Sequence, residues 1–176
     1  VLPGGCARSL WLLIDFKAEP EASYHALAVL LHRYRGMLTR AQRAGVRDGA
    51  VRVVITGERP KQLLAGEPEW LAGYDGRVLE HDTSAPMAMM PLVSEQWGRL
   101  FEWTGVGTMP AAERARLVAI VAQMHAEGRA VRFWATPDEP SVWRELLTAR
   151  VDYINTDDLP GLRHFLRQQA AAAPLP

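Results

Sequence analysis

The class of fold is clearest from residues 110–155, with the sequence PAAERARLVAIVAQMHAEGRAVRFWATPDEPSVWRELLTARVDYIN. Its first part has apolar residues at spacings of three and four and ends at a glycine, which predicts an amphipathic helix. We place a helix, a strand, a second helix and a second strand at 110–127, 131–135, 141–148 and 151–155. Strands that alternate with helices of this length indicate βαβ units and a parallel sheet.

The same alternation extends in both directions along the chain. The apolar run LWLLI at 10–14 is typical of a strand buried on both faces, and VRVVI at 51–55 predicts a second strand. An amphipathic helix over 22–43, with breaks expected near Gly36 and Gly45, connects the two strands. The remaining predicted elements are a weak helix after Pro60, short strands at 77–81 and 89–93, and a last helix at 159–169. The glycines between Gly66 and Gly76 indicate turns.

Composition limits the classes of protein to consider. The 176 residues are 48% hydrophobic and 23% charged, which suits one soluble domain over 1–176, with a frayed tail at 170–176. The 20 basic and 20 acidic residues give no net charge, which argues against a dedicated nucleic-acid binder. No apolar run approaches the about 20 residues of a transmembrane helix. A single cysteine, Cys6, excludes an internal disulfide framework and a zinc site built from thiolates alone.

The absence of two nucleotide-binding motifs reduces the number of α/β folds to consider. No G-x-G-x-x-G turn and no G-x-x-x-x-G-K-[ST] loop follows a predicted strand, so a dinucleotide-binding or P-loop protein has no support. A doubly wound sheet remains an alternative, but we expect a (β/α)8 TIM-type barrel. In either fold the chemistry lies at the carboxyl ends of the strands.

Asp15 and Lys17 occupy such a strand end. Strand side chains repeat every two residues, so both point to the same side of the sheet. A carboxylate and an ammonium group placed together can hold a divalent cation and an anionic oxygen side by side. They can equally form an internal salt bridge, and the residues alone leave both interpretations open.

Arg132 and Trp134 share one side of a later strand. An arginine in a buried strand needs a carboxylate or an anion as its partner. Arg132 could therefore bind phosphate, or it could pair with one of three carboxylates, those of Asp15, Glu80 and Asp152. Trp134 could line the wall of a ligand site, although a single tryptophan is more often part of the core.

Other polar residues favour structural roles. Glu80, His81 and Asp82 are consecutive, so a surface loop is favoured over a metal or acid–base site. Asp157 and Asp158 precede the last helix and are interpreted as helix caps. The sequence has no Ser-His-Asp order, no H-E-x-x-H motif and no zinc spacing. Four histidines lie on predicted helices: His25, His32, His125 and His164.

Two segments resemble glycerophosphodiester phosphodiesterases. The ending VRFWATPDEPSVWRELLTARVDYINTDDLPGLRHFL at 131–166 is similar to the last two strand–helix units of that family, and LLIDFK at 12–17 is similar to its strand with a Glu-x-Lys ending. The chain is most similar to a divergent branch, related also to phosphatidylinositol-specific phospholipase C, that contains the fungal altered-inheritance-of-mitochondria proteins and bacterial homologues. DGR, MPLVS, FEWTGVG and RFWATPD carry this resemblance at 75–77, 90–94, 101–107 and 132–138.

The resemblance implies a site as well as a fold. The family uses a barrel in which a divalent metal, calcium or magnesium, and a pair of histidines cleave a phosphodiester. Asp15 matches a metal-ligand position with Asp in place of Glu, Lys17 a position near the substrate phosphate, and Trp134 the tryptophan that lines the mouth. The family's histidines precede the strand that ends in Asp-x-Lys, so the order is wrong for His81, and no catalytic residue is assigned to this chain.

These implications give one function and two alternatives. We expect the C-terminal part of a barrel, from about the third strand onward, of a metal-dependent phosphodiester hydrolase whose substrate is a small phosphodiester or a lipid head group. By itself this chain would then be inactive. The first alternative is a non-catalytic barrel that acts as a binding or structural module. The second is an unrelated α/β binding domain. The sequence leaves the oligomeric state open, and a secreted or periplasmic location would require a signal peptide upstream of Val1.

Overall fold

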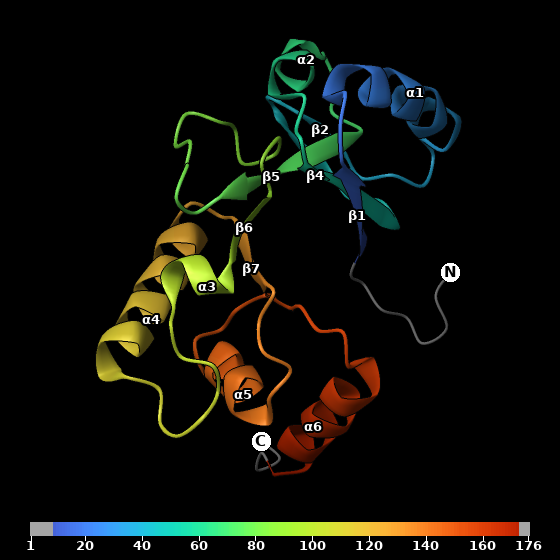
Figure 1. The fold of residues 1–176 in the computed structure, drawn as a ribbon. Coiled ribbons are helices and arrows are strands. Elements are labelled where there is room, and N and C mark those ends of the chain that lie inside the picture. Colours follow the sequence, from blue (N-terminus) through green and yellow to red (C-terminus); the bar gives the residue numbers. More distant parts are fainter. Residues whose placement is uncertain (1–8, 173–176) are drawn as a thin grey trace. The chain divides into compact units, whose positions relative to one another are not determined.

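Strands and helices alternate along the chain as the sequence predicts (Figure 1). The structure, a computed structural model, describes residues 9–172; Cys6 and the last four residues of the predicted tail lie outside them. The elements in chain order are β1 (Leu10–Phe16), α1 (Pro20–Arg33), β2 (Arg40–Gln42), β3 (Gly45–Arg47), β4 (Val51–Gly57), α2 (Lys61–Gly66), β5 (Ala72–Arg77), β6 (Leu92–Gln96), α3 (Trp97–Leu100), α4 (Ala111–Ala126), β7 (Ala130–Trp134), α5 (Pro140–Thr148), β8 (Tyr153–Ile154) and α6 (Leu159–Ala172).

The main sheet within the described residues has six strands in the order β1-β4-β5-β6-β7-β8. The pairings of β1 with β4, β4 with β5 and β7 with β8 are parallel. A strand order that follows the chain is the winding of a (β/α)8 barrel, whereas a doubly wound sheet reverses its order at a switch point. The predicted α/β class is thus confirmed, and six successive strands are consistent with part of a TIM-type barrel.

Contacts divide the chain into two compact units, Val1–Leu92 (unit 1) and Val93–Pro176 (unit 2). The expectation of one domain over 1–176 remains a prediction. None of the helices in residues 9–172 is long and apolar enough to cross a bilayer.

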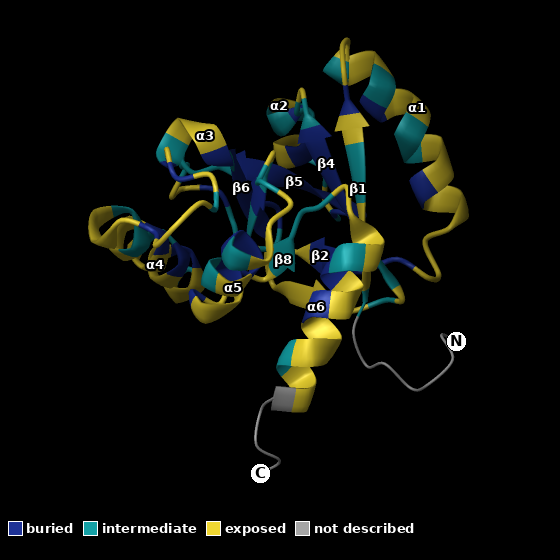
Figure 2. Ribbon diagram, turned by 60° about the horizontal axis from the view of Figure 1, so that its bottom comes forward, coloured by how far each residue is buried: buried dark blue, intermediate teal, exposed yellow. Residues whose placement is uncertain are grey.

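Unit 1 is built around β4 and β5, whose buried residues are dark blue in Figure 2. Val54 and Ile55 of β4 are fully buried, and Tyr74 of β5 is 1% exposed. The helix α1 adds Tyr24 and Leu31 to this core, at the spacing of seven residues that places two side chains on one helical face.

Unit 2 has an aromatic core under β7. Phe133 is fully buried and meets Trp97 and Phe101 edge-on, with ring centroids 6.0 and 5.7 Å away. Each such edge-to-face pair stabilises the fold by about 0.5–1.5 kcal/mol beyond the contribution from burying the rings. A second cluster joins α5 to α6, where Trp143 and Phe165 lie 5.6 Å apart.

Four predicted elements differ from the structure. The helix placed at 22–43 ends at Arg33, and the chain then forms the β2–β3 hairpin. Tertiary pairing supports this hairpin, because the Ala41 N–H donates to the Trp70 carbonyl and the Trp70 N–H donates back, at 2.9 and 2.7 Å. The strand placed at 10–14 forms, but Leu10 and Leu12 are exposed. Within residues 9–172, β1 lies at the end of the strand order and has β4 as its single neighbour.

The third difference concerns the predicted strand at 77–81, which is wrong: β5 ends at Arg77. The glycines of AGYDGR suggested a turn, yet they allow a buried strand. A Cβ on Gly73 would lie 2.7 Å from Pro91 Cδ and 2.9 Å from the Met89 carbonyl, so only glycine fits there. Nearby, the strand expected at 89–93 begins at Leu92, after a turn in which the Met90 N–H donates to the Pro86 carbonyl.

Candidate functional site

A tight turn ends β4 and directs the following loop. Gly57 has φ +73, in the left-handed region that favours glycine, and a Cβ there would lie 2.2 Å from the Phe16 carbonyl oxygen. The next residue, Glu58, donates its N–H to that same carbonyl at 2.9 Å. The turn therefore fixes where the chain leaves the sheet, two residues before the side chain of Arg59.

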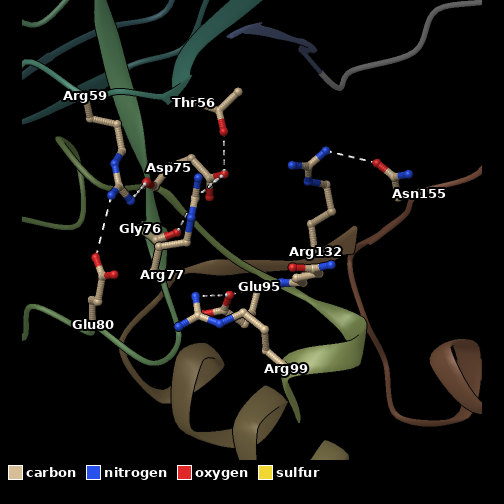
Figure 3. A network of polar contacts seen from close by, with 11 residues as sticks. Thr56, Arg59, Asp75, Gly76, Arg77, Glu80, Glu95, Arg99, Arg132 and Asn155 are labelled. Carbon is tan, nitrogen blue, oxygen red and sulfur yellow. Dashed lines mark hydrogen bonds and ion pairs between the residues drawn. The ribbon is translucent and has the colours of Figure 1, made fainter. Parts of the chain in front are cut away.

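Asp75 is the centre of a polar cluster at the carboxyl ends of β4 and β5, drawn in Figure 3. Its side chain is fully buried. Oδ2 accepts hydrogen bonds from the Thr56 hydroxyl at 3.0 Å and from Arg77 Nη1 at 2.9 Å. Because Ile55 pairs with Tyr74, the next residues of the two strands, Thr56 and Asp75, are neighbours in register.

Two arginines meet at this aspartate. Arg59 Nη1 donates to the Asp75 carbonyl at 3.0 Å, and its Nη2 lies 3.7 Å from Glu80 Oε2. The side chains of Arg59 and Arg77 are each 14% exposed. Burial, and then the like charge of Arg77, lower the pKa of Arg59 below its usual value, and the neighbouring carboxylates oppose this shift. The cluster therefore concentrates positive charge in a partly desolvated place.

Unit 2 carries a second buried carboxylate at a strand end. Glu95 of β6 is fully buried, and its Oε1 accepts from the Gln96 N–H and from Arg99 Nη1, both at 3.1 Å. A buried glutamate is costly unless it is paired, and the arginine one helical turn onward supplies a positive charge. This pair is also drawn in Figure 3.

Arg132 and Trp134 lie on β7 as the sequence predicts, both half-buried. Arg132 Nη1 donates to Asn155 Oδ1 at 3.0 Å, immediately after β8. The three carboxylates proposed as its partners pair with other groups. Asp15 pairs with Lys17, Glu80 with Arg59, and Asp152 with His125 at 2.8 Å.

Asp15 and Lys17 come together at the end of β1. The Lys17 ammonium donates to Asp15 Oδ2, so the salt-bridge interpretation describes their contact. Both side chains are accessible, Lys17 at 85% and Asp15 at 45%. Asp15 and Lys17 belong to unit 1, whereas Arg132 and Trp134 belong to unit 2.

The described residues do not assemble a divalent-cation site by themselves. Across 9–172 no three His, Cys, Asp or Glu side chains gather in a way that could hold a metal ion. Asp15 could contribute one carboxylate oxygen, and its present partner is an ammonium group. A role of Asp15 as a metal ligand remains a prediction.

The other polar residues have structural roles. Asp82 Oδ1 accepts from the Ser84 hydroxyl and N–H at 2.6 and 2.9 Å, and these bonds lower its pKa, as expected for a loop. Asp158 caps α6, because its Oδ1 accepts the Gly161 N–H at 2.9 Å. The predicted placement of four histidines on helices is confirmed, and all four are exposed: His25, His32, His125 and His164.

Sequence reasoning missed the polar cluster around Asp75. DGR at 75–77 carried a family resemblance but no assigned role. The available signal was alternation: Gly73, Asp75 and Arg77 fall on one face of a strand, opposite the aromatic Tyr74. The partners Thr56 and Arg59 could be found only once β4 was known to pair with β5.

A model of the glycerophosphoryl diester phosphodiesterase family matches residues 130–160. The matched segment contains β7, α5 and β8, and therefore Arg132, Trp134 and Asn155. No curated protein and no solved structure matched the chain. The match covers a small part of the chain, and it indicates a relationship to phosphoric diester hydrolases without assigning catalytic residues.

Proposed function

We propose that the chain is part of a phosphodiester hydrolase that acts on glycerophosphodiester or phosphoinositide-type head groups. The observation that carries this proposal is the family match over β7, α5 and β8. That segment brings a guanidinium group to a strand end, where Arg132 and Asn155 are hydrogen-bonded at 3.0 Å. Arginine at the carboxyl end of a strand is well suited to binding a phosphate oxygen.

Each predicted site residue has a role in this proposal. Arg132 would bind a non-bridging phosphate oxygen, with the half-buried ring of Trp134 as an apolar wall for the alcohol part of the substrate. Within unit 1, Lys17 would bind an anionic substrate oxygen, and Asp15 beside it would be one ligand of a calcium or magnesium ion. The histidines that the family uses as acid and base have no match in this chain, so no proton transfer is assigned to its residues.

The experiment is hydrolysis of bis(p-nitrophenyl) phosphate by the full-length protein that carries this chain, with calcium or magnesium present. We expect metal-dependent turnover, and we expect Asp15→Ala to abolish it. Asp48→Ala is the matched control, because Asp48 is an exposed aspartate that also pairs with a basic residue, Arg52. Turnover that is unchanged in Asp15→Ala would rule out Asp15 as a metal ligand.

A second candidate function is a non-catalytic binding module of the same fold. The described residues favour it in one respect, since they hold no group of three metal ligands and the Asp15 carboxylate is paired with Lys17. The hydrolysis assay together with a binding measurement distinguishes the two functions. A binding module would retain saturable affinity for glycerophosphocholine and would show no turnover with either metal.

A further inference from the structure

The cluster around Asp75 has more positive charge than its buried carboxylate neutralises. Arg59 and Arg77 both bond to Asp75, one to its carbonyl and one to its carboxylate. Asp75 supplies one negative charge for the two guanidinium groups. Glu80 supplies the second from the loop after β5, but its side chain is 60% exposed and its oxygen lies 3.7 Å from Arg59 Nη2, beyond hydrogen-bond distance.

The guanidinium groups also retain donors. All hydrogen bonds of Arg77 to residues within 9–172 come from Nη1, which serves both Asp75 Oδ2 and the Gly76 carbonyl. Arg59 donates one hydrogen bond there, from Nη1. Each guanidinium has five N–H donors in a fixed fork that fits phosphate oxygens. The hydrogen bonds to Asp75 hold both side chains in place, so little conformational entropy is left to lose on binding.

We propose that Arg59 and Arg77 form a binding site for a phosphodiester monoanion, in which the ligand displaces the Glu80 carboxylate from Arg59. The charge balance selects the ligand class. With Glu80 displaced, two arginines and Asp75 leave one net positive charge, which a singly charged phosphodiester neutralises. A phosphate dianion would leave excess negative charge beside the buried Asp75 carboxylate. The ligand class rests on the proposed function, whereas the residues are new, because both arginines lie outside the segment 130–160 that matches the family model.

Calorimetric titration of the protein at mildly alkaline pH, where inorganic phosphate is predominantly the dianion, tests this site without requiring hydrolysis. Dimethyl phosphate represents a soluble diester, phosphatidylglycerol vesicles present the same group on a lipid, and inorganic phosphate represents the more highly charged ion. We expect saturable binding of at least one of the two diesters, tighter than that of inorganic phosphate. Arg59→Gln should weaken it about ten-fold or more, the effect of losing a hydrogen bond to a charged group.

Two further variants separate binding from folding. Glu80→Gln leaves the buried groups intact and removes the competing carboxylate, so diester affinity should rise about three-fold, as for the loss of one exposed ion pair. Arg52→Gln is the matched control, because Arg52 pairs with an exposed aspartate near the opposite end of β4, and it should leave affinity unchanged. The proposal is overturned if neither diester binds saturably, if inorganic phosphate binds more tightly, or if Glu80→Gln and Arg59→Gln both keep the wild-type affinity. Loss of turnover with diester binding retained would count against the proposed hydrolase alone.

Discussion

Asp75→Asn tests whether the buried cluster stabilises unit 1. The substitution keeps the shape of the side chain and removes its charge, which leaves Arg77 without its charged partner at 2.9 Å. Breaking a buried pair costs about 3–5 kcal/mol. Arg77 is 14% exposed and asparagine can still accept one hydrogen bond, so we expect a loss of about 2–4 kcal/mol in the free energy of unfolding.

Urea unfolding followed by tryptophan fluorescence measures this loss, since the chain has 6 tryptophans. Asp48→Asn is the matched control: Asp48 also pairs with an arginine at 2.9 Å, but it is 75% exposed. Its substitution should cost less than about 1 kcal/mol. If the two variants lost the same free energy of unfolding, the argument that burial makes the Asp75 pair important would be wrong.

Two further variants test local features of unit 1. Gly57→Ala should lower the free energy of unfolding by about 1–3 kcal/mol, because alanine at positive φ is strained and its Cβ would meet the Phe16 carbonyl. Gly66→Ala is the control in the same urea assay, because a Cβ at Gly66 has open space around it. Burial, followed by the charge of Glu67, raises the pKa of Tyr24 to about 12. The pKa of this tyrosine in the unfolded chain is 10.0, so the contribution of Tyr24 to the free energy of unfolding is fully present below pH 10. It is lost as the pH rises towards 12. Tyr24→Phe should make this fall shallower in alkaline unfolding curves, and an unaltered curve would contradict the shift.

The regular parts of the fold could be predicted because local pattern and tertiary packing agree there. The apolar stripe that ends at Gly128 predicts α4, and the buried residues of that helix, Leu117, Val121 and Met124, lie on this stripe. The strand at 131–135 is found at Ala130–Trp134 for the same reason. In these segments nothing distant in the sequence opposes the local preference.

Prediction failed where distant contacts decide the local structure. The helical pattern continues to residue 43, but Ala41 pairs with Trp70 and the chain forms a hairpin instead. Gly73 suggests a turn, yet it lies in a buried strand because Pro91 and the Met89 backbone pack too closely for any side chain. Both outcomes depend on residues 15 or more positions away, which a local pattern does not contain.

The same reason explains what was found of the candidate site. Asp15, Lys17, Arg132 and Trp134 could be selected because each is polar or aromatic at the end of an apolar strand. Asp75 was missed because the strand that carries it was not recognised. The burial of Asp75 and its bonds to Thr56 and Arg77 depend on the pairing of β4 with β5, so they follow from the tertiary structure alone.

An NMR titration with glycerophosphocholine tests whether the carboxyl ends of the strands are the face that binds a phosphodiester. Amide resonances of ¹⁵N-labelled protein would be followed as the ligand is added. We expect saturable shifts at Arg132, Trp134 and Asn155, where β7 and β8 end. We expect none at His125 and Asp152, which pair near the amino ends of those strands. Shifts confined to His125 and Asp152, or no saturable shift at any residue, would contradict this expectation.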